Sequence, residues 1–399
     1  MLSRRELIRR IGLGALAGSI PGMSFARADT DVRFVLVILR GAVDGLGVVA
    51  PYGDGNYRNV RGELAIDAPG AANGLLKLDG LFGLHPSMTG THELYRRKEA
   101  IVVHAVASPY RERSHFDGQD VLENGSGLAG RIRNGWLNRA IGPLGGSLGD
   151  ECAIAMAQNT PLVLRGNNSV TSWAPSQLPE ANADTLRRIE MLYADDKFFS
   201  TRLQQALESQ EIAGAMDGMD GRRRNNELEQ WKTMAQATAK FLTAPNGPQI
   251  AVLETGGWDT HANQGAGTGY LANRLAALDA SLDELRRGLG DTWSDTVVAV
   301  ATEFGRTVNV NGTRGTDHGT ATALLLLGGA VDGGRILTDW PGLGKSDLFE
   351  ERDLYPSTDL RSVFKGILAE HLRLDGGFVE HEVFPGSASA RPLEGLIRS

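Results

Sequence analysis

The run VRFVLVIL at residues 32–39 constrains the fold more than any other feature of the chain. It is almost continuously apolar, it is rich in β-branched residues, and it stops at Arg40 and Gly41. A strand that is apolar on both faces has to be covered on both faces, which is the situation of an inner strand of a parallel sheet. We therefore expect residues 32–39 to form a central buried strand.

Further apolar runs alternate with segments of helical periodicity. The other predicted strands are residues 101–106, 250–253, 297–301 and 323–327, with weaker candidates at 153–156 and 162–164. The predicted helices are residues 87–98, 182–207, 225–242, 270–289 and 357–372. The clearest helix, 270–289, carries leucines at steps of three and four residues, so that they share one face. This alternation predicts an α/β fold, a three-layer sandwich with a mainly parallel central sheet. Two Asp-Gly pairs and an arginine triplet predict an exposed loop or hinge at 208–224.

The first 28 residues have the features of an export signal. Residues 3–8 (SRRELI) match the twin-arginine pattern, and the apolar stretch at 11–20 is too short to span a bilayer. Residues 26–28 (ARA) offer a small-x-small cleavage site. We predict a twin-arginine signal peptide at 1–28, recognised by the twin-arginine translocase, and a mature domain at 29–399 that is periplasmic or secreted. The alternative is a cytosolic protein with a basic amphipathic first helix.

Charge and cysteine content argue against several kinds of partner and site. The formal net charge is −7, and removal of the basic leader makes the remaining chain more acidic. An acidic chain is poorly suited to nucleic acid or anionic lipid, so we expect no nucleic-acid partner. No apolar stretch after the leader is long enough for a stable membrane anchor. Cys152 is the only cysteine, which excludes an intrachain disulfide and thiolate-based metal sites.

Polar residues gather where the predicted strands end. Such segments follow four strands and directly precede the strand at 323–327. They are RGAVDG (40–45), SPYRERSHFD (108–117), ETGGWDTH (254–261), EFGR (303–306) and DHG (317–319). Ligands of open α/β sheets bind outside the carboxyl ends of the strands, so we expect the functional site there.

Six residues in these segments are of the types that hold divalent cations. They are Asp44, Asp259, His261, Glu303, Asp317 and His318. Carboxylate oxygens and imidazole nitrogens bind zinc, manganese and calcium, so a divalent metal of this kind is the predicted cofactor. Asp259 and His261 are two residues apart and would point the same way in an extended segment. The structural alternatives are a turn at Asp44, a cap or Asx-turn at Asp259 and an ordinary loop histidine at His318.

Ser114 is the candidate nucleophile, because it stands at a predicted helix start. A hydroxyl beside the free backbone donors of a helix N-terminus suits attack on a phosphate or sulfate. His115 and Arg306 complete the predicted catalytic set, and Arg111, Arg113 and Arg306 are cations available to an anionic substrate. The alternatives are an ordinary N-cap for the serine and surface positions for the arginines.

Seven motifs resemble a family of bacterial twin-arginine-exported proteins, domain of unknown function 1501, which is a branch of the alkaline phosphatase and sulfatase-like superfamily. They are RGAVDGL (40–46), SHFDGQD (114–120), GGWDTH (256–261), TEFGRT (302–307), GTDHGTA (315–321), GGAVDGGRI (328–336) and DW (339–340). The likeness covers nearly the whole mature chain. The superfamily implies metal-dependent hydrolysis or transfer of phosphate and sulfate esters at a site of one or two metals.

The resemblance also implies roles for individual residues. Asp44 looks like the metal-binding aspartate after the first strand, and Ser114 stands where the nucleophile would begin a helix. Asp259 and His261 resemble the superfamily's mid-chain aspartate and histidine, although the usual spacing is longer.

The end of the chain allows two registers. In one, Asp317-His318 is the superfamily's Asp-His-Gly. In the other, which the strand order favours, Glu303-Phe304-Gly305 takes that place and His318 is the final metal histidine. The second register puts a glutamate and Phe304 where the superfamily has aspartate and histidine, which weakens one metal position.

The sequence therefore predicts an exported, metal-dependent hydrolase that acts on a small anionic phosphate or sulfate ester. The alternative is a non-catalytic exported binding or assembly protein on the same fold.

Overall fold

The computed structural model describes residues 32–144, 152–175, 183–193, 196–213, 227–245 and 247–398. The strands are β1 (Arg33–Leu39), β2 (Val49–Ala50), β3 (Leu76–Lys77), β4 (Gly83–Leu84), β5 (Ala100–Ala107), β6 (Ala153–Ala155), β7 (Thr171–Ser172), β8 (Ile250–Thr255), β9 (Thr296–Thr302), β10 (Thr322–Leu327), β11 (Arg335–Leu337) and β12 (Thr358–Asp359). The α-helices are α2 (Gly45–Val48), α3 (Tyr57–Arg61), α4 (Thr89–Arg96), α5 (His115–Asn124), α6 (Trp136–Ile141), α7 (Ala183–Tyr193), α8 (Lys197–Ala213), α10 (Glu227–Thr243), α11 (Tyr270–Leu289), α12 (Leu360–Glu370) and α13 (Gly376–Phe378).

A large mixed sheet forms the centre of the molecule. Its order is β11-β5-β10-β9-β1-β8-β6-β7, with β12 also paired to β5. The pairs that β1 forms with β8 and β9 are parallel, whereas β10 runs antiparallel to both of its neighbours, β5 and β9. β1 is buried along almost its whole length, as its continuous apolar run predicts. The strands β2, β4 and β3 form a separate small antiparallel sheet.

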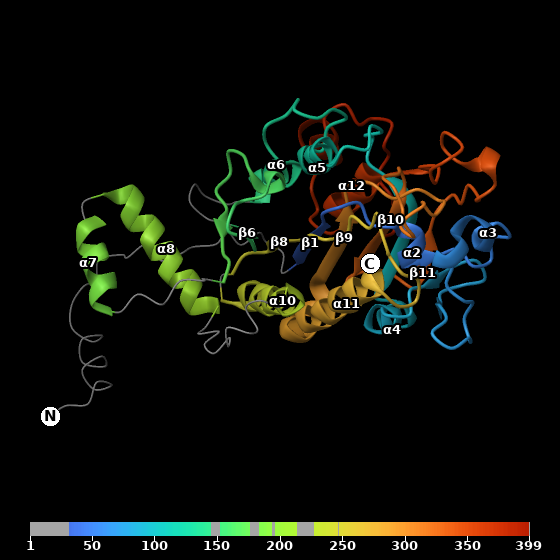
Figure 1. Cartoon of the computed structure of the whole chain (residues 1–399). Coiled ribbons are helices and arrows are strands. Elements are labelled where there is room, and N and C mark those ends of the chain that lie inside the picture. Colours follow the sequence, from blue (N-terminus) through green and yellow to red (C-terminus); the bar gives the residue numbers. More distant parts are fainter. Residues whose placement is uncertain are drawn as a thin grey trace.

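Helices cover both faces of the large sheet, which gives three layers (Figure 1). On one face α4, α10 and α11 pack against the sheet in one apolar core, and on the other α6 and α12 pack in a second core. The leucine face of α11, from Leu271 to Leu289, is buried in the first core. The predicted α/β class, the three layers and the mainly parallel sheet are thus confirmed.

The five principal predicted strands are confirmed, and so is the weaker candidate at 153–156, which is β6. The strand predicted at 162–164 is wrong. Residues Leu162–Leu164 form a 3-10 turn instead, since the carbonyl of Pro161 accepts from the N–H of Leu164. Pro161 fixes its own φ at −64°, and three residues are too few for their apolar character to distinguish a turn from a strand.

The helices predicted at 87–98, 225–242, 270–289 and 357–372 are present as α4, α10, α11 and α12. The single helix predicted at 182–207 is wrong, because this stretch contains two helices, α7 and α8. The side chain of Asp196 accepts from the N–H of Phe199 at 3.1 Å, so it caps the start of α8 and separates the two helices. The loop predicted at 208–224 is wrong for its first part, where α8 continues to Ala213, and residues 214–224 lie outside the described residues.

The export signal predicted at 1–28 also lies outside the described residues. Among the helices that the structure describes, none combines the length and the apolar character that a bilayer span requires.

Candidate metal centre

One edge of the large sheet brings the predicted site segments together. β1, β5, β8 and β9 end at this edge, and β10 begins there because it runs the other way. The turn after β1 lies close to the segment after β8. Gly41 has φ +122°, and a Cβ on it would lie 2.8 Å from the backbone nitrogen of Asp259. Only glycine tolerates this conformation and this close approach of the backbone, which explains why position 41, at the end of the first strand, is a glycine.

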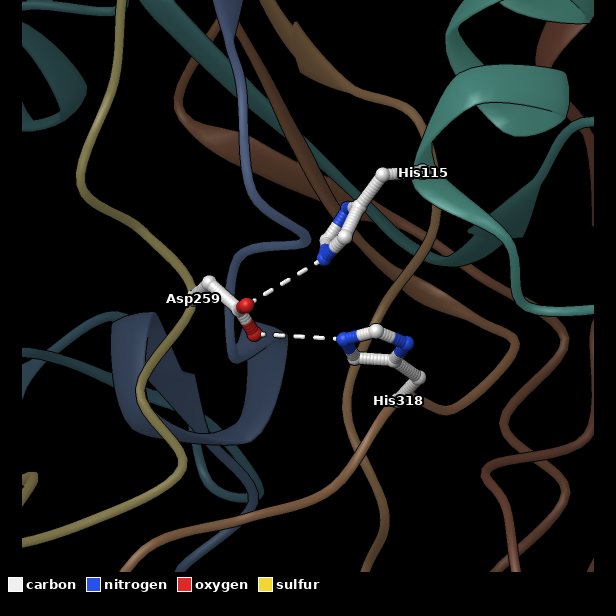
Figure 2. Close-up of side chains that lie close together, drawn as sticks. All are labelled: His115, Asp259 and His318. Carbon is white, nitrogen blue, oxygen red and sulfur yellow. Dashed lines mark hydrogen bonds and ion pairs between the residues drawn. The ribbon is translucent and has the colours of Figure 1, made fainter.

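Three side chains that could hold a metal ion point toward one another, as Figure 2 shows. They are His115 from the start of α5, Asp259 from the segment after β8 and His318 from the segment before β10. Nε2 of His318 lies 3.2 Å from Oδ1 of Asp259, and Nε2 of His115 lies 3.3 Å from Oδ2. Ligand atoms bound tetrahedrally at about 2.0–2.1 Å lie about 3.3 Å from one another. The two distances from the histidines to the carboxylate are close to this value, and the ligand atoms of the three residues all lie within 4.8 Å of one another, so the group could hold a metal ion.

The proton of neutral His318 is on the side of the ring away from Asp259. Nδ1 of His318 lies 2.9 Å from the backbone carbonyl oxygen of Arg113, which can only accept, so Nδ1 carries the hydrogen. Burial lowers the pKa of His318, which favours the neutral ring. The bare Nε2 lone pair then faces a carboxylate oxygen, and a cation between these two acceptors would stabilise them.

His115 is held in the corresponding way by a carboxylate. Its Nδ1 lies 2.9 Å from Oε1 of Glu303, whose side chain is fully buried. The hydrogen bond with Glu303 raises the pKa of His115 and outweighs the opposing effect of burial. Burial alone would raise the pKa of Glu303, but the hydrogen bond from His115 and other donors lower it. Nε2 of His115 is buried, and its nearest acceptor is Oδ2 of Asp259 at 3.3 Å, without the geometry of a hydrogen bond, so a metal ion between the two would satisfy both.

His261 adds a third imidazole beside this group. Its Nδ1 lies 3.2 Å from Oδ1 of Asp317, and its Nε2 lies 3.0 Å from both Oδ1 of Asp259 and Nε2 of His318. A neutral imidazole has one N–H and cannot donate in both directions. The contacts of His261 are therefore satisfied either by a second proton on the ring or by a cation at Nε2. A cation at Nε2 would also satisfy His318.

Asp259 is ionised at the centre of the group. Burial raises the pKa of Asp259, but the hydrogen bond and charge of the Arg306 guanidinium outweigh burial and lower it overall. Arg306 is buried and also donates to the backbone carbonyl and the hydroxyl of Thr316. Arg306, predicted to be catalytic, thus fixes the carboxylate that both histidines face.

The group is partly open to solvent. The side chains of His115 and His318 are each 25% exposed, and that of Asp259 is 40% exposed. Closed structural metal sites fill all positions with protein ligands, whereas three ligands with an accessible position are typical of catalytic sites. A small molecule can therefore reach a metal held here.

Ser114 occupies the N-cap position of α5, directly before His115. Its hydroxyl makes no capping hydrogen bond, although its backbone has the extended conformation of an N-cap. The backbone N–H of Ser114 donates to the hydroxyl of Tyr110 at 3.1 Å. The side chain of the predicted nucleophile is therefore not used in capping the helix.

The other predicted metal ligands lie outside the three-residue group. Asp44 is buried, where its carboxylate accepts from Arg61 and, at 2.6 Å, from Nε2 of Gln264. Glu303 lies behind His115, and Asp317 lies on the far side of His261, where a hydrogen bond from Asn311 lowers its pKa. Metal binding by these residues stays a prediction.

Sequence reasoning missed two features of the site. Arg61 and Gln264, the partners of Asp44, carried no signal, since neither lies next to a predicted strand end in a recognisable motif. The sequence predicts His115 only as a catalytic residue and not as a metal ligand. Its position after the N-cap serine, at the carboxyl end of a strand, was a signal that could have identified it as a ligand.

Comparisons with known proteins give a family and a set of distant structural likenesses. A family model described as "Protein of unknown function (DUF1501)" matches residues 31–384. A search of curated proteins found no match to this chain.

Three solved structures illustrate the structural likeness. Phosphonate monoester hydrolase of Agrobacterium radiobacter has 12% identity and a TM-score of 0.39, over 86% of this chain and 74% of that one. The C-terminal periplasmic domain of EcEptC from Escherichia coli, in complex with Zn, has 9% identity and a TM-score of 0.34, over 78% and 77%. PsFucS1 sulfatase from Pseudoalteromonas sp. has 14% identity and a TM-score of 0.38, over 92% and 74%. At this level of identity and TM-score, the likenesses assign no role to any residue of this chain.

Proposed function

Since the chain belongs to the DUF1501 family of proteins of unknown function, we propose its function from its own residues: an exported, metal-dependent hydrolase of phosphate or sulfate esters. The observation that carries the proposal is the convergence of His115, Asp259 and His318. Two imidazole Nε2 atoms face one carboxylate, and the Nδ1 atom of each ring contacts an oxygen acceptor. This is the arrangement of histidines prepared to bind a metal through Nε2.

The ion would be a divalent one of the zinc, manganese or calcium kind, and two imidazoles in the ligand set favour zinc or manganese over calcium. When bound, it would polarise an ester oxygen and stabilise negative charge on it. The arginines nearby are already engaged, Arg306 with Asp259 and Arg113 with Glu350 and Asp353. A metal is therefore the simplest source of positive charge for an anionic substrate at this edge of the sheet.

Ser114 is the proposed nucleophile. Its hydroxyl is not engaged in capping α5, and it lies next to His115 in the chain. Attack by its oxygen on phosphorus or sulfur would form a serine ester and break the bond to the leaving oxygen, which would take up the proton that the serine loses and depart as the alcohol. Water would then hydrolyse the serine ester, which would release phosphate or sulfate and restore the hydroxyl. The backbone N–H groups of the first turn of α5 are suited to hold the oxygens of the anionic group.

Export through the twin-arginine translocase, to the periplasm or beyond, is part of the proposal. It rests on the SRRELI pattern at 3–8 and the ARA site at 26–28. Cell fractionation of a strain that expresses the full chain, with an Arg4→Lys/Arg5→Lys variant beside it, tests this part. Retention of the variant in the cytoplasm supports twin-arginine export, and export of both forms contradicts it.

Elemental analysis of the purified full chain tests the metal site. We expect stoichiometric metal in the native protein and its loss in His318→Ala and Asp259→Asn. His381→Ala is the matched control, because His381 is exposed and far along the chain from the group, and it should keep its metal. Metal retained in both site variants would exclude these residues as ligands.

Turnover of a panel of phosphate and sulfate monoesters tests the reaction. We expect Ser114→Ala to keep its metal, to remain as stable as the wild type, and to lose turnover by more than about 10³-fold. A fully metallated native protein that hydrolyses no ester would contradict the hydrolase proposal and favour the non-catalytic binding or assembly protein.

A further inference from the structure

A polar cavity lies next to the loop that supports the metal centre. Its volume is about 440 Å³, and it is lined by the loop after β5, the start of α12 and the segment near residue 391. The loop after β5 contributes Arg111, two residues before Arg113, whose carbonyl accepts from His318. The cavity is separate from the His115, Asp259 and His318 group, none of which lines it.

The cations in this cavity are not neutralised by acids bound to them. Arg111 is half-buried, and its guanidinium donates to the backbone carbonyl oxygens of Ser108 and Tyr110. Arg391 also lines the cavity, and no described residue forms a hydrogen bond or ion pair with its side chain. The one acid in the lining, Asp359, acts on Arg111 through its charge but forms no ion pair with it, because it is bound to Arg361 at 2.7 Å and also caps α12. The cavity therefore carries excess positive charge.

A hydroxyl in the lining lacks a partner. Oγ of Ser357 is buried without any hydrogen bond among the described residues. Ser357 lines the cavity, but its Oγ is turned away from the open space, so the side chain has to rotate about χ1 to donate to a ligand. The hydrogen bond gained in this way would offset the free energy that a buried hydroxyl without a partner costs. The cavity also lies at the N-terminus of α12, where the helix dipole favours negative charge.

We propose that this cavity binds a tetrahedral oxyanion, phosphate or sulfate, through Arg111, Arg391 and Ser357. Two guanidinium groups and a free hydroxyl are the donors that such an anion requires, and its charge compensates the unpaired arginines. The cavity is a second anion site beside the metal centre, and it does not depend on the proposed hydrolase activity.

Isothermal titration of inorganic sulfate into the metal-free full chain tests the proposal, because removal of metal eliminates coordination of sulfate by the ion, and the variants below then show whether the binding is in this cavity. We expect one saturable site in the wild type. Arg391→Gln, a change at an exposed residue, should weaken sulfate binding about tenfold or more. Arg373→Gln is the matched control, since this exposed arginine follows the other end of α12, about 16 Å away, and sulfate should bind to it as to the wild type.

Ser357→Ala separates binding from folding. Loss of a buried hydroxyl that has no partner should leave the melting temperature unchanged or raise it, while sulfate binding weakens. Inorganic phosphate, titrated in the same way, shows whether the site distinguishes the two anions. The absence of saturable binding in the wild type, or wild-type affinity in both Arg391→Gln and Ser357→Ala, would overturn the proposal.

Discussion

Glu303 illustrates how one buried side chain sets the chemistry of another. Its carboxylate accepts from Nδ1 of His115, from the backbone N–H of Gly41 and from Nε2 of Gln119. It therefore fixes the orientation of the His115 ring and the nitrogen that is free to bind a metal. Outer partners of metal ligands are typically needed for full affinity.

We predict that Glu303→Gln lowers metal affinity about 10- to 100-fold without removing the site. The amide has the same shape, but it lacks the charge that orients and polarises His115. Competition with a chromogenic chelator measures the affinity. Glu351→Gln, which removes a carboxylate that is 67% exposed and paired with Lys345, should bind metal as the wild type does. Equal affinity in both variants would show that Glu303 does not act through His115.

The sequence predicted which segments meet but not which atoms face one another. The segments that carry His115, Asp259 and His318 follow or precede strands whose ends share one edge, so their convergence could be predicted from the α/β pattern. Glu303 was predicted as a ligand and His115 as catalytic, whereas the structure puts the histidine in the group and the glutamate behind it. Side-chain direction depends on packing around each residue, which strand spacing does not contain.

At the scale of elements, the buried ion pair of Asp44 and Arg61 joins α3 to the turn after β1. Both side chains are almost completely buried, and Arg61 also donates to the backbone carbonyl of Val308 at 3.1 Å. Removal of one member of such a pair leaves an uncompensated buried charge.

We predict that Arg61→Met lowers the free energy of unfolding by about 3–5 kcal/mol and that Arg61→Met/Asp44→Asn recovers much of this loss. Urea titration measures both variants. Asp44→Asn should also keep its metal, because the carboxylate is occupied by Arg61 and Gln264. Loss of metal from Asp44→Asn would instead support the ligand role that the sequence predicts.

His104 makes strand β5 sensitive to acid. Complete burial lowers its pKa to about 4, and its Nε2 donates to the backbone carbonyl of Val49 at 2.8 Å while Nδ1 accepts from the N–H of Ala105. The unfolded chain binds a proton at this histidine near pH 6.5 and the folded chain does not, so stability falls as the pH drops from about 6.5 towards 4.

We predict that His104 accounts for about 2 kcal/mol of stability lost between pH 7 and pH 5. The measurement is urea unfolding at both pH values. His104→Gln cannot titrate at this position, so between pH 7 and pH 5 its free energy of unfolding should fall by about 2 kcal/mol less than that of the wild type. The exposed His381→Gln should behave as the wild type does. An unchanged difference in His104→Gln would mean that other groups, such as His85 and His371, whose pKa values burial also lowers, carry the acid sensitivity.

For the whole molecule, the sequence predicted the layers and the central strands because these depend on local apolar patterns. The inner strands β1, β5, β8, β9 and β10 and the leucine face of α11 followed from such patterns. The antiparallel direction of β10 and the short strands β11 and β12 beside β5 did not. The direction of a strand and its place in the sheet are set by pairing between residues that are far apart in the chain. A strand of two or three residues is also too short to show an apolar periodicity in the sequence.

The candidate metal centre also ties distant parts of the chain together. Its three residues come from α5, from the segment after β8 and from the segment before β10, so the unfolded chain does not hold them near one another. A metal that binds only the folded form stabilises it by about 4 kcal/mol at a concentration 1,000 times its dissociation constant.

We therefore predict that the native protein melts several degrees higher with its metal than after treatment with a chelator. Calorimetry of both forms measures the shift, and readdition of metal should restore it. The melting temperature of His318→Ala should change neither on treatment with the chelator nor on readdition of metal, because this variant lacks one of the residues that would bind the metal. The melting temperature of His381→Ala should respond as that of the wild type does. A shift that persists in His318→Ala would mean that the stabilising metal is bound elsewhere in the chain.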